Sequence, residues 1–176
     1  NKKLIKDIKI FKKENTLKKL ENTIIQNYSN SNFFDLYKNE FFQILTNKFN
    51  EGNLCNLNKE IILWILKILN IKKKIYLSSE LKVSGDKINR IISFCEYFKI
   101  NNYISTAGTK DYLKKETHKF KDKNIKILLH NYVHPSYNQL FGKFIPYASC
   151  LDLIFNEGNN SYNILVQGRK NFKHLK

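Results

Sequence analysis

The centre of the predicted fold is a short apolar segment, IKILLHNY, at residues 125–132. Four of its first five residues are isoleucine or leucine. An apolar run of this kind, interrupted only by Lys126, favours a strand in the middle of a sheet. We therefore predict a strand at 125–132 in a central position of a sheet.

Strand and helix patterns alternate before this segment. We predict short strands at 74–78 and 103–105, and helices at 85–98 and 109–115. The resulting order of strand, helix, strand, helix, strand favours parallel strands with right-handed crossovers. The predicted fold class is α/β: a three-layer, mostly parallel sheet with flanking helices, Rossmann-like.

The remaining parts of the chain show weaker or helical patterns. A weak alternation at 4–11 allows a strand, and 169–176 is expected to be a frayed tail. Apolar residues at helical spacing predict further helices at 17–28, 33–49, 59–69, 150–156 and 160–167. The helix at 59–69 is apolar nearly all round and is expected to be buried on most sides. Residues 1–176 are expected to form a single α/β domain.

The composition indicates a folded protein of a reducing compartment. Hydrophobic residues make up 42% of the 176 residues, which is enough to bury a core. The longest apolar run, 61–66, is far shorter than the roughly 20 residues that a membrane span needs. No signal peptide opens the sequence, and the three cysteines form no CxxC pair, so we expect a cytoplasmic location without disulfides or zinc.

The net charge of +16 raises the question of a nucleic-acid partner. Among the 31 basic residues only Arg90 and Arg169 are arginine, the residue that base contacts and bidentate phosphate contacts favour. The lysines are scattered from Lys2 to Lys176 without a long basic stripe. We therefore expect no specific nucleic-acid partner, whereas an acidic ligand or peripheral association with an anionic membrane remains compatible with the charge.

Small and polar residues follow each of the three predicted strands. Ser79 and Gly85 follow the first, Ser105 and Gly108 the second, and His134 the third. In open parallel sheets ligands bind beyond the carboxyl ends of the strands, and helix N-termini favour anions. The sequence therefore predicts a ligand site at this edge of the sheet.

Two basic residues, Lys87 and Arg90, lie in the first turns of the predicted helix at 85–98 and would neutralise a phosphate there. Each loop also has a simpler interpretation, because Ser84 can act as a helix N-cap and 105–108 can be an ordinary strand-to-helix turn. Neither a P-loop nor a GxGxxG motif is present.

The candidate catalytic residues are His134, Asp111 and Asp152. His134 can serve as a general acid or base, or as a hydrogen-bonded loop histidine. Asp111 and Asp152 lie near predicted helix starts, where a carboxylate either stabilises the helix or has a functional role. His130 and His134 have no third ligand nearby, so no metal site is predicted, and the sequence identifies no cofactor. Cys150 is expected in the core.

Three aromatic residues, Tyr137, Phe144 and Tyr147, lie in an irregular stretch before the helix at 150–156. Both a core position and a role as a platform for stacking a sugar remain open for them.

Four segments of the chain, in this order and spacing, resemble the WbqC-like protein family. They are SGDKINRI at 84–91, YISTAGTKDYL at 103–113, Tyr137-Asn138-Gln139, and FIPYASCLDLIFNEG at 144–158. The resemblance extends from about residue 75 to 158 and is weaker before that. It implies a role in the biosynthesis of O-antigen and related surface polysaccharides, with transfer of glycine or another acyl group onto a sugar.

The resemblance also directs the assignment of site residues. Tyr137 and Gln139 match the family's Tyr-x-Gln and are expected to bind ligand. A sugar or an activated acyl donor, phosphorylated in our expectation, would bind over these residues: Ser79, Gly85, Lys87, Arg90, Ser105 and Gly108. His134, Asp111 or Asp152 would deprotonate the acceptor. The alternative is a non-enzymatic binding or scaffold subunit of a glycan-assembly complex.

The family normally begins with a strand and a Gln-Pro-x-Tyr-x-Pro-type segment. This chain begins at Asn1, contains no methionine and lacks that segment. We therefore expect an N-terminally truncated WbqC-like domain. Thr106 stands where the family often has glycine or proline, so the turn after 103–105 is expected to differ.

Overall fold

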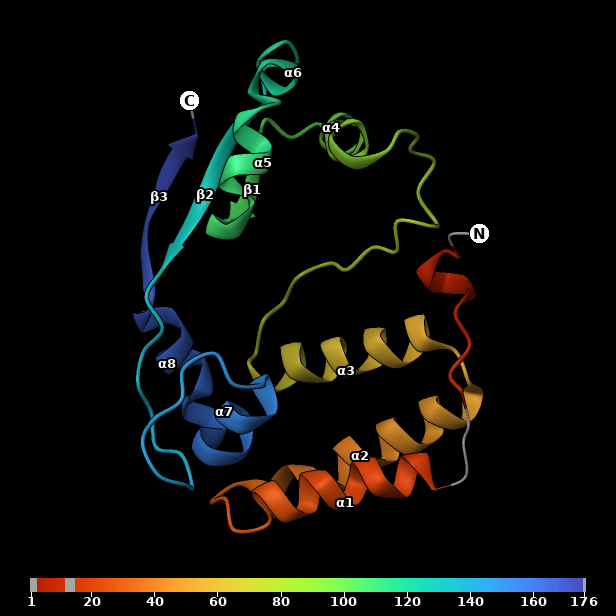
Figure 1. Ribbon diagram of the computed structural model, residues 1–176, viewed down its shortest axis with the longest axis vertical. Helices are drawn as coiled ribbons and strands as arrows, with labels where there is room; N and C mark the ends of the chain where they lie inside the picture. The colour runs from red at the N-terminus through yellow and green to blue at the C-terminus, as the bar shows by residue number, and fades with distance from the viewer. Residues whose placement is uncertain (1–2, 12–14, 176) are drawn as a thin grey trace. The chain divides into compact units, whose positions relative to one another are not determined.

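The computed structural model describes residues 3–11 and 15–175 (Figure 1). The chain divides into two compact units. Unit 1 comprises Asn1–Lys74 and His134–Val166, and unit 2 comprises Ile75–Val133 and Gln167–Lys176. Each unit is therefore built from two separate stretches of the sequence. The expectation of a single domain stays a prediction.

Unit 1 is helical in its described residues. Its elements are the 3-10 turn η1 (Ile5–Asp7), α1 (Thr16–Tyr28), α2 (Phe34–Glu51), α3 (Leu54–Ile68), α7 (Cys150–Glu157), the 3-10 turn η3 (Gly158–Asn160) and α8 (Ser161–Gln167). The helices predicted at 17–28, 33–49, 150–156 and 160–167 are confirmed within a few residues. The α8 helix ends one residue before Gly168, and the last residue of α8 already belongs to unit 2.

The core of unit 1 is built around Phe155 of α7, whose side chain is fully buried. Its ring packs against Phe34 at 5.1 Å, Tyr28 at 5.4 Å and Phe41 at 6.1 Å between ring centroids. Trp64 of α3 extends the same cluster through Phe41. Burying large aromatic side chains is the main stabilising term here, so the core fixes α7 against α1 and α2.

Two predictions for unit 1 are wrong. Residues 4–11 form the η1 turn and one isolated bridge, between Lys9 and Asn53, instead of a strand. The helix predicted at 59–69 begins earlier, at Leu54, because the Asn53 side chain caps it by accepting a hydrogen bond from the Asn56 amide at 3.0 Å. This helix is also not buried on most sides, since Ile62 and Leu63 are 46% and 37% exposed.

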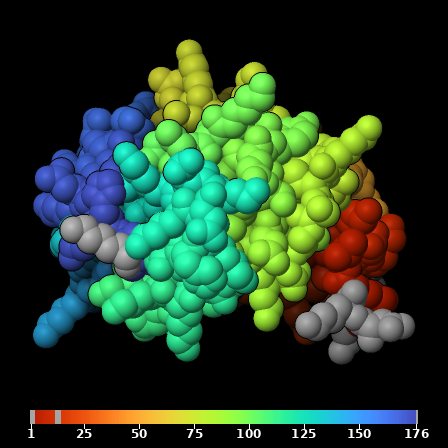
Figure 2. All heavy atoms as spheres, turned by 90° about the horizontal axis from the view of Figure 1, so that it is seen from above, coloured from red at the N-terminus to blue at the C-terminus, as the bar shows by residue number. Residues whose placement is uncertain are grey.

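Unit 2 contains a three-stranded mixed sheet and short helices. Its elements are α4 (Lys87–Tyr97), β1 (Asn102–Thr106), the 3-10 turn η2 (Ala107–Thr109), α5 (Lys110–Lys114), α6 (Thr117–Lys121), β2 (Lys126–Tyr132) and β3 (Arg169–Leu175). The strand order is β1-β2-β3, with β1 parallel and β3 antiparallel to β2. Figure 2 shows the segment from α4 to α6 as spheres, in lime to teal. The predicted central position of the 125–132 strand is confirmed.

The core of unit 2 lies on one face of this sheet. Ile127 and Leu129 of β2 are 4% and 5% exposed, and the fully buried Phe120 of α6 belongs to the same cluster. The α4 helix adds a buried stripe at helical spacing, consisting of Ile88, Ile92 and Cys95. Burial raises the pKa of the Cys95 thiol, as expected for a cysteine that packs as a small apolar residue.

The strand predicted at 74–78 is absent. Ile75 and Tyr76 are exposed, and the Tyr76 ring packs on Phe98 at 4.8 Å instead of joining a sheet. Ser79 therefore follows no strand, and the residue preceding α4 is Asp86, not Ser84. The α/β class is confirmed, but the structure does not confirm a three-layer, mostly parallel, Rossmann-like sheet, because the sheet has one parallel and one antiparallel pair.

The prediction of a frayed tail at 169–176 is also wrong for its described residues, 169–175. They form β3, which pairs antiparallel with β2 from Tyr132–Arg169 to Ile127–Leu175. Its side chains are almost all exposed, so no apolar alternation marks the strand in the sequence. Backbone hydrogen bonds to β2, which a sequence pattern does not reveal, hold it in place. Lys176 lies outside the described residues.

Candidate functional site

Four of the predicted site residues lie in unit 1: His134, Tyr137, Gln139 and Asp152. The first three belong to the irregular segment before α7, and Asp152 lies in the first turn of α7. This turn is fixed by Ser149, whose hydroxyl accepts a hydrogen bond from the Leu151 amide at 3.2 Å. Ser149 is therefore the N-cap of α7.

The Asp152 carboxylate is buried and is the acceptor at the centre of the site. Its Oδ2 accepts hydrogen bonds from the Tyr137 hydroxyl at 2.7 Å and from Gln139 Nε2 at 2.8 Å. Its Oδ1 has a longer contact of 3.4 Å with Asn156 Nδ2, which also donates to the Asp152 carbonyl at 2.8 Å. Because Oδ2 is occupied by two donors, Oδ1 is the oxygen with capacity for a ligand.

Gln139 is held at both ends of its side-chain amide. Its Oε1 accepts a hydrogen bond from the Ile145 amide at 2.8 Å, and its Nε2 donates to the Ile145 carbonyl at 3.1 Å as well as to Asp152. These bonds close a loop of the chain between residues 139 and 145 and fix the direction of the amide. Gln139 therefore orients the carboxylate and the loop together.

Tyr137 and Tyr28 are both affected by this carboxylate. Burial raises the pKa of Tyr137 strongly, and its hydrogen bond to the Asp152 carboxylate raises it further. Burial also raises the pKa of Tyr28, with a smaller contribution from the charge of Asp152. Both phenols therefore keep their protons near neutral pH and can act as hydrogen-bond donors.

His134 joins the site through aromatic contacts. Its ring lies 6.2 Å from Tyr137, 5.7 Å from Phe144 and 4.8 Å from Tyr147, between ring centroids. Its Nδ1 is 2.9 Å from the carbonyl oxygen of Pro135. Since a carbonyl can only accept, Nδ1 is the donor if this contact is a hydrogen bond.

A cavity of about 150 Å³ lies beside Asp152 within unit 1. It is lined by Asn27, Tyr28, Gln139, Leu140, Phe141, Ile145, Ala148 and Asp152. A cavity of roughly this size holds one six-membered ring. The cavity therefore combines a carboxylate, two side-chain amides and a phenol with an apolar wall.

The rim of this cavity carries exposed apolar side chains. Phe141 and Ile145 are 65% and 66% exposed, and both line the cavity. Nearby in sequence, Tyr147 is 73% exposed and has a φ of 62°, a conformation that costs free energy for a residue with a side chain and that is often found at functional positions. Exposed rings beside planar polar groups are the arrangement that a sugar ring requires, because one face of the sugar stacks while its hydroxyls bond.

The remaining predicted residues lie in unit 2, and three of them surround the end of β1. The Ser105 hydroxyl is buried and lies 2.8 Å from the Thr109 hydroxyl, which donates to the Thr106 carbonyl at 2.8 Å. These contacts fix the turn that η2 forms. Gly108 and Asp111 are exposed on η2 and α5.

The other four residues lie before and within α4. Ser79 belongs to an exposed turn, and Gly85 has a φ of 101°, which favours glycine. Arg90 Nε donates a hydrogen bond to the Gly85 carbonyl at 3.0 Å, so this guanidinium closes the loop at the start of α4. Lys87 and Arg90 are both exposed. Binding of a phosphorylated donor at these residues stays a prediction.

Several residues of the site could not be found from the sequence. Asn27 and Tyr28 come from the end of α1, more than a hundred residues before Asp152, and no motif marks them. Phe141 gave only the weak signal of an aromatic residue next to a glycine in an irregular stretch. Cys150, expected in the core, is exposed at the first position of α7.

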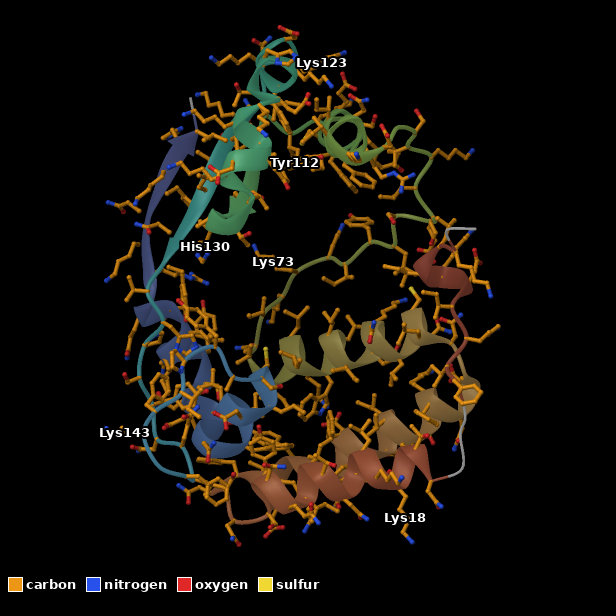
Figure 3. The ribbon with its side chains drawn as sticks, in the orientation of Figure 1. Lys18, Lys73, Tyr112, Lys123, His130 and Lys143 are labelled. Atoms are coloured by element: carbon orange, nitrogen blue, oxygen red, sulfur yellow. The ribbon has the colours of Figure 1, made fainter. Side chains whose placement is uncertain are left out.

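The described residues were also compared with the requirements of a metal site and of a membrane-spanning helix. Within 3–11 and 15–175, no three His, Cys, Asp or Glu side chains gather as a metal site would require, and no helix there has the length and apolar character of a membrane span. Lysines such as Lys18, Lys73, Lys123 and Lys143, labelled in Figure 3, come from separate segments of the chain.

Comparison with known proteins places these residues in a family. Residues 1–164 match the WbqC-like protein family. The chain is 28% identical over 107 residues to a protein of Mycobacterium tuberculosis (strain ATCC 25618 / H37Rv) named "Uncharacterized protein Rv1507c". The alignment covers 60% of this chain and 46% of that relative, so the chain spans less than half the length of the relative. No solved structure matches the chain. Because the family match extends over most of its residues, the chain belongs to the WbqC-like protein family.

Proposed function

We propose that this protein takes part in the assembly of O-antigen or a related surface polysaccharide, and that it binds the acceptor sugar of a transferase reaction in the cavity beside Asp152. The observation that carries the proposal is the position of the Asp152 carboxylate, held by Tyr137 and Gln139 at the wall of a ring-sized cavity with an exposed aromatic rim. Membership of the WbqC-like protein family supports the link to surface glycans.

The side chains of the site suit a sugar with hydroxyl or amino groups. Asp152 Oδ1 would accept a hydrogen bond from the reacting group, the Tyr28 hydroxyl and Asn27 amide would bond to neighbouring hydroxyls, and Phe141 would stack on the ring. An ammonium group would gain more than a hydroxyl, because hydrogen bonds between charged partners are about twice as strong as neutral ones.

The reaction that we propose is acyl transfer, with glycine as one acyl group that the family suggests. The oxygen or nitrogen of the acceptor forms a bond to the carbonyl carbon of an activated donor. The bond between that carbon and the leaving group breaks, and the leaving group departs with the electron pair. The acceptor proton passes to a base, for which Asp152 and His134 are the candidates in unit 1. Asp111 in unit 2 stays a predicted alternative.

A second function, that of a non-enzymatic binding or scaffold subunit of a glycan-assembly complex, is favoured by a specific observation. Both acceptor positions of Asp152 Oδ2 are used within the protein, as in a carboxylate with a structural role. The cavity is also smaller than the roughly 300–1,000 Å³ of typical ligand sites. If the protein is a scaffold, it would still bind the sugar, and the composition of the surface glycan would not change when Asp152 loses its ability to accept a proton.

Asp152→Asn tests the proposal, because it keeps the shape of the side chain and removes its charge. Binding of glucosamine and glucose would be followed by NMR titration of the full chain. We expect glucosamine to bind about tenfold more weakly to the variant and glucose to lose less, since only the ammonium depends on the charge. The matched control is Asp35→Asn, the same change at an exposed position of α2 in unit 1.

The cellular experiment compares surface polysaccharide by mass spectrometry from cells with the intact gene, without it, and with the Asp152→Asn variant. The transferase proposal predicts loss of an acyl substituent in the second and third cases. Polysaccharide that loses the substituent without the gene but keeps it in the variant would favour the scaffold function. Identical polysaccharide in all three would contradict both.

A further inference from the structure

A second cavity, of about 360 Å³, lies within unit 2 beside the end of β1. It is lined by Ala107, Lys110, Leu129, His130, Asn131, Lys173, His174 and Leu175. Its volume lies within the range of small-molecule sites, roughly 300–1,000 Å³. No residue of the site in unit 1 takes part in it.

The strand register determines which side chains share one face of the sheet here. Leu129 and Asn131 are two residues apart on β2, so their side chains lie on the same face. Leu129 pairs with Lys173 and Asn131 pairs with Lys170 across the antiparallel ladder. Directly opposed residues of such a pair lie on the same face, so Lys170 and Lys173 share the face of Leu129 and Asn131.

An irregularity of the ladder makes this possible. Lys170 and Lys173 are three residues apart, and in a regular strand they would lie on opposite faces. The register shifts between Leu129 and Asn131, so that one residue of β2, His130, faces two residues of β3. A bulge of this kind redirects side chains and is frequent beside binding sites. Here it places Lys173, which lines the cavity, on the same face as Lys170, Leu129 and Asn131.

The charges of the cavity are not compensated by nearby carboxylates. Lys110 reaches it from the start of α5, and Lys173 from β3. None of the ion pairs formed by residues 3–11 and 15–175 involves Lys110, Lys170 or Lys173. The lining contains no aspartate or glutamate. Two exposed lysines therefore line an open cavity without an ion-pair partner among the described residues.

We propose that this cavity binds the phosphate group of a small phosphate monoester, with Lys110 and Lys173 as its cationic ligands. A monoester carries a charge of about −1.5 to −2 at neutral pH, which two lysines match. Asn131 supplies an amide donor, and Ala107, Leu129 and Leu175 supply an apolar wall for the organic part. The inference does not rest on the function proposed for unit 1.

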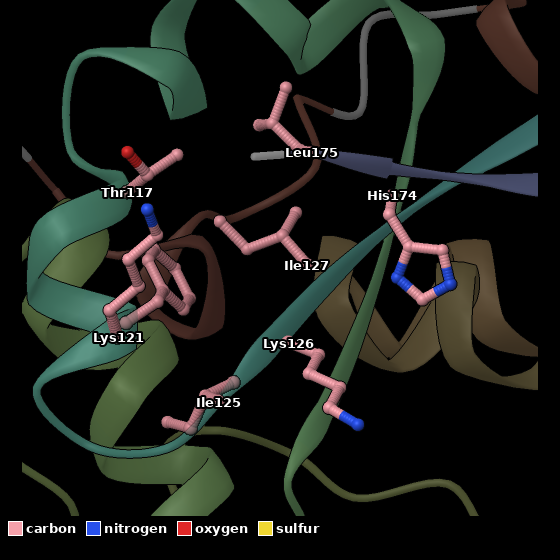
Figure 4. A pocket seen from close by; sticks show the side chains of 8 residues that line it. Thr117, Lys121, Ile125, Lys126, Ile127, His174 and Leu175 are labelled. Atoms are coloured by element: carbon pink, nitrogen blue, oxygen red, sulfur yellow. The ribbon is translucent and has the colours of Figure 1, made fainter.

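A neighbouring cavity offers space for the organic part of the ligand. It has about 430 Å³, half of its lining side chains are apolar, and it shares His174 and Leu175 with the first cavity. Figure 4 shows Ile127 and Leu175 on the same side as Thr117 and Lys121, with Lys126 on the other side of β2. A phosphate monoester could thus be a sugar phosphate contained in the first cavity, or an alkyl phosphate whose chain extends into the second.

The experiment measures binding of glucose 1-phosphate and of hexyl phosphate to the full chain by calorimetry. We compare the wild type with Lys110→Gln, Lys173→Gln and the double variant. Each single change removes one charge-assisted contact, and we expect each to weaken binding about tenfold and the double variant more. Lys114→Gln, the same change on the exposed end of α5, serves as the matched control and should stay within about twofold.

The two ligands identify the source of the phosphate. Tighter binding of hexyl phosphate indicates a chain in the neighbouring cavity, and tighter binding of glucose 1-phosphate indicates a sugar phosphate; either result supports the site if it depends on Lys110 and Lys173. Far-UV circular dichroism confirms that the variants fold.

Three results would overturn the proposal. The first is unchanged affinity in the double variant, and the second is no binding to the wild type up to about 10 mM of either ligand. The third is an equal loss of phosphate affinity in Arg90→Gln, which would indicate that the anion binds at the loop around Gly85 instead. Asp152→Asn, the test of the unit 1 site, should leave phosphate affinity unchanged, so the two proposals fail separately.

Discussion

In unit 1 the polar groups of the candidate site are already bonded to one another, whereas in unit 2 the lysines beside the cavity are not paired with any described carboxylate. Asp152 accepts hydrogen bonds from Tyr137 and Gln139, and Gln139 is tied to Ile145. Lys110 and Lys173, in contrast, have no ion-pair partner among residues 3–11 and 15–175.

The difference indicates two ways of preparing for a ligand. Burying a carboxylate without hydrogen-bond donors would cost folding free energy, so the protein supplies the donors to Asp152 itself. A ligand then finds a small cavity beside a carboxylate whose direction is already fixed. Exposed ammonium groups are hydrated at little cost, so they can remain unpaired until an anion replaces their water. We therefore expect unit 1 to respond to mutation mainly through stability and unit 2 mainly through affinity.

The largest effect is expected from Gly158→Ala in unit 1. Gly158 ends α7 with a φ of 51°, and a Cβ there would lie 2.3 Å from the ring of Phe33. Backbone strain and overpacking together should lower the free energy of unfolding by about 3 kcal/mol or more. Urea denaturation followed by circular dichroism would measure it.

Gly108→Ala is the corresponding change beside the cavity of unit 2. A Cβ at Gly108 meets no atom within 4 Å, and its φ is not in the left-handed region. We expect a change of less than about 0.5 kcal/mol in the free energy of unfolding. Equal effects of the two glycine changes would contradict the view that the turn in unit 1 is the more rigid.

An effect between those of the two glycine changes is expected from Tyr137→Phe, which removes one donor to Asp152. The loss should be about 1.5–3 kcal/mol in the free energy of unfolding at neutral pH, the range of a hydrogen bond to a charged group. The phenylalanine keeps the ring contact with Phe144, so the fold should persist.

The same variant should alter the pH dependence of stability. The pKa of Tyr137 is raised in the folded state above its ordinary value of about 10, so its contribution is complete below about pH 10 and declines as the pH rises through the folded pKa. The wild type should therefore lose more stability than Tyr137→Phe between about pH 9 and pH 11. Parallel curves would show that the phenol proton is not held by the folded protein.

The smallest effect concerns salt. Binding of glucose 1-phosphate through exposed lysines should weaken several-fold between about 0.05 and 0.5 M NaCl, because ions screen surface charges. Binding of neutral glucose beside Asp152 should change less than about twofold over the same range. A strong salt effect on glucose, or none on the phosphate, would remove the distinction between the two sites.

The sequence predicted the elements whose burial follows a simple period. The apolar run of β2 indicated a central strand, and the apolar stripe of α4 indicated the helix that covers it. The sequence-based predictions failed for segments whose structure depends on pairing with distant residues and not on a local apolar period. The 74–78 segment stays outside the sheet although it contains Ile75, Tyr76 and Leu77, and β3 is ordered by its backbone while its side chains remain exposed.

The candidate site was predictable only in part. Tyr137, Gln139 and Asp152 were each selected from the sequence, but nothing there showed that all three meet at one carboxylate oxygen. Tyr28 comes from a distant helix, and Lys173 of unit 2 lies beside a bulge in the ladder. Contacts between residues far apart in the chain, and a one-residue shift in register, leave no local periodicity to detect.

The placement of β3 has a consequence for biosynthesis. The strand joins the sheet of unit 2 although the whole second stretch of unit 1, His134–Val166, is translated between β2 and β3. The ribosome therefore delivers the residues around Asp152 before it delivers the partner of β2. During that interval one edge of β2 has no neighbour, so the nascent chain carries an open strand that a chaperone or a premature association could cover.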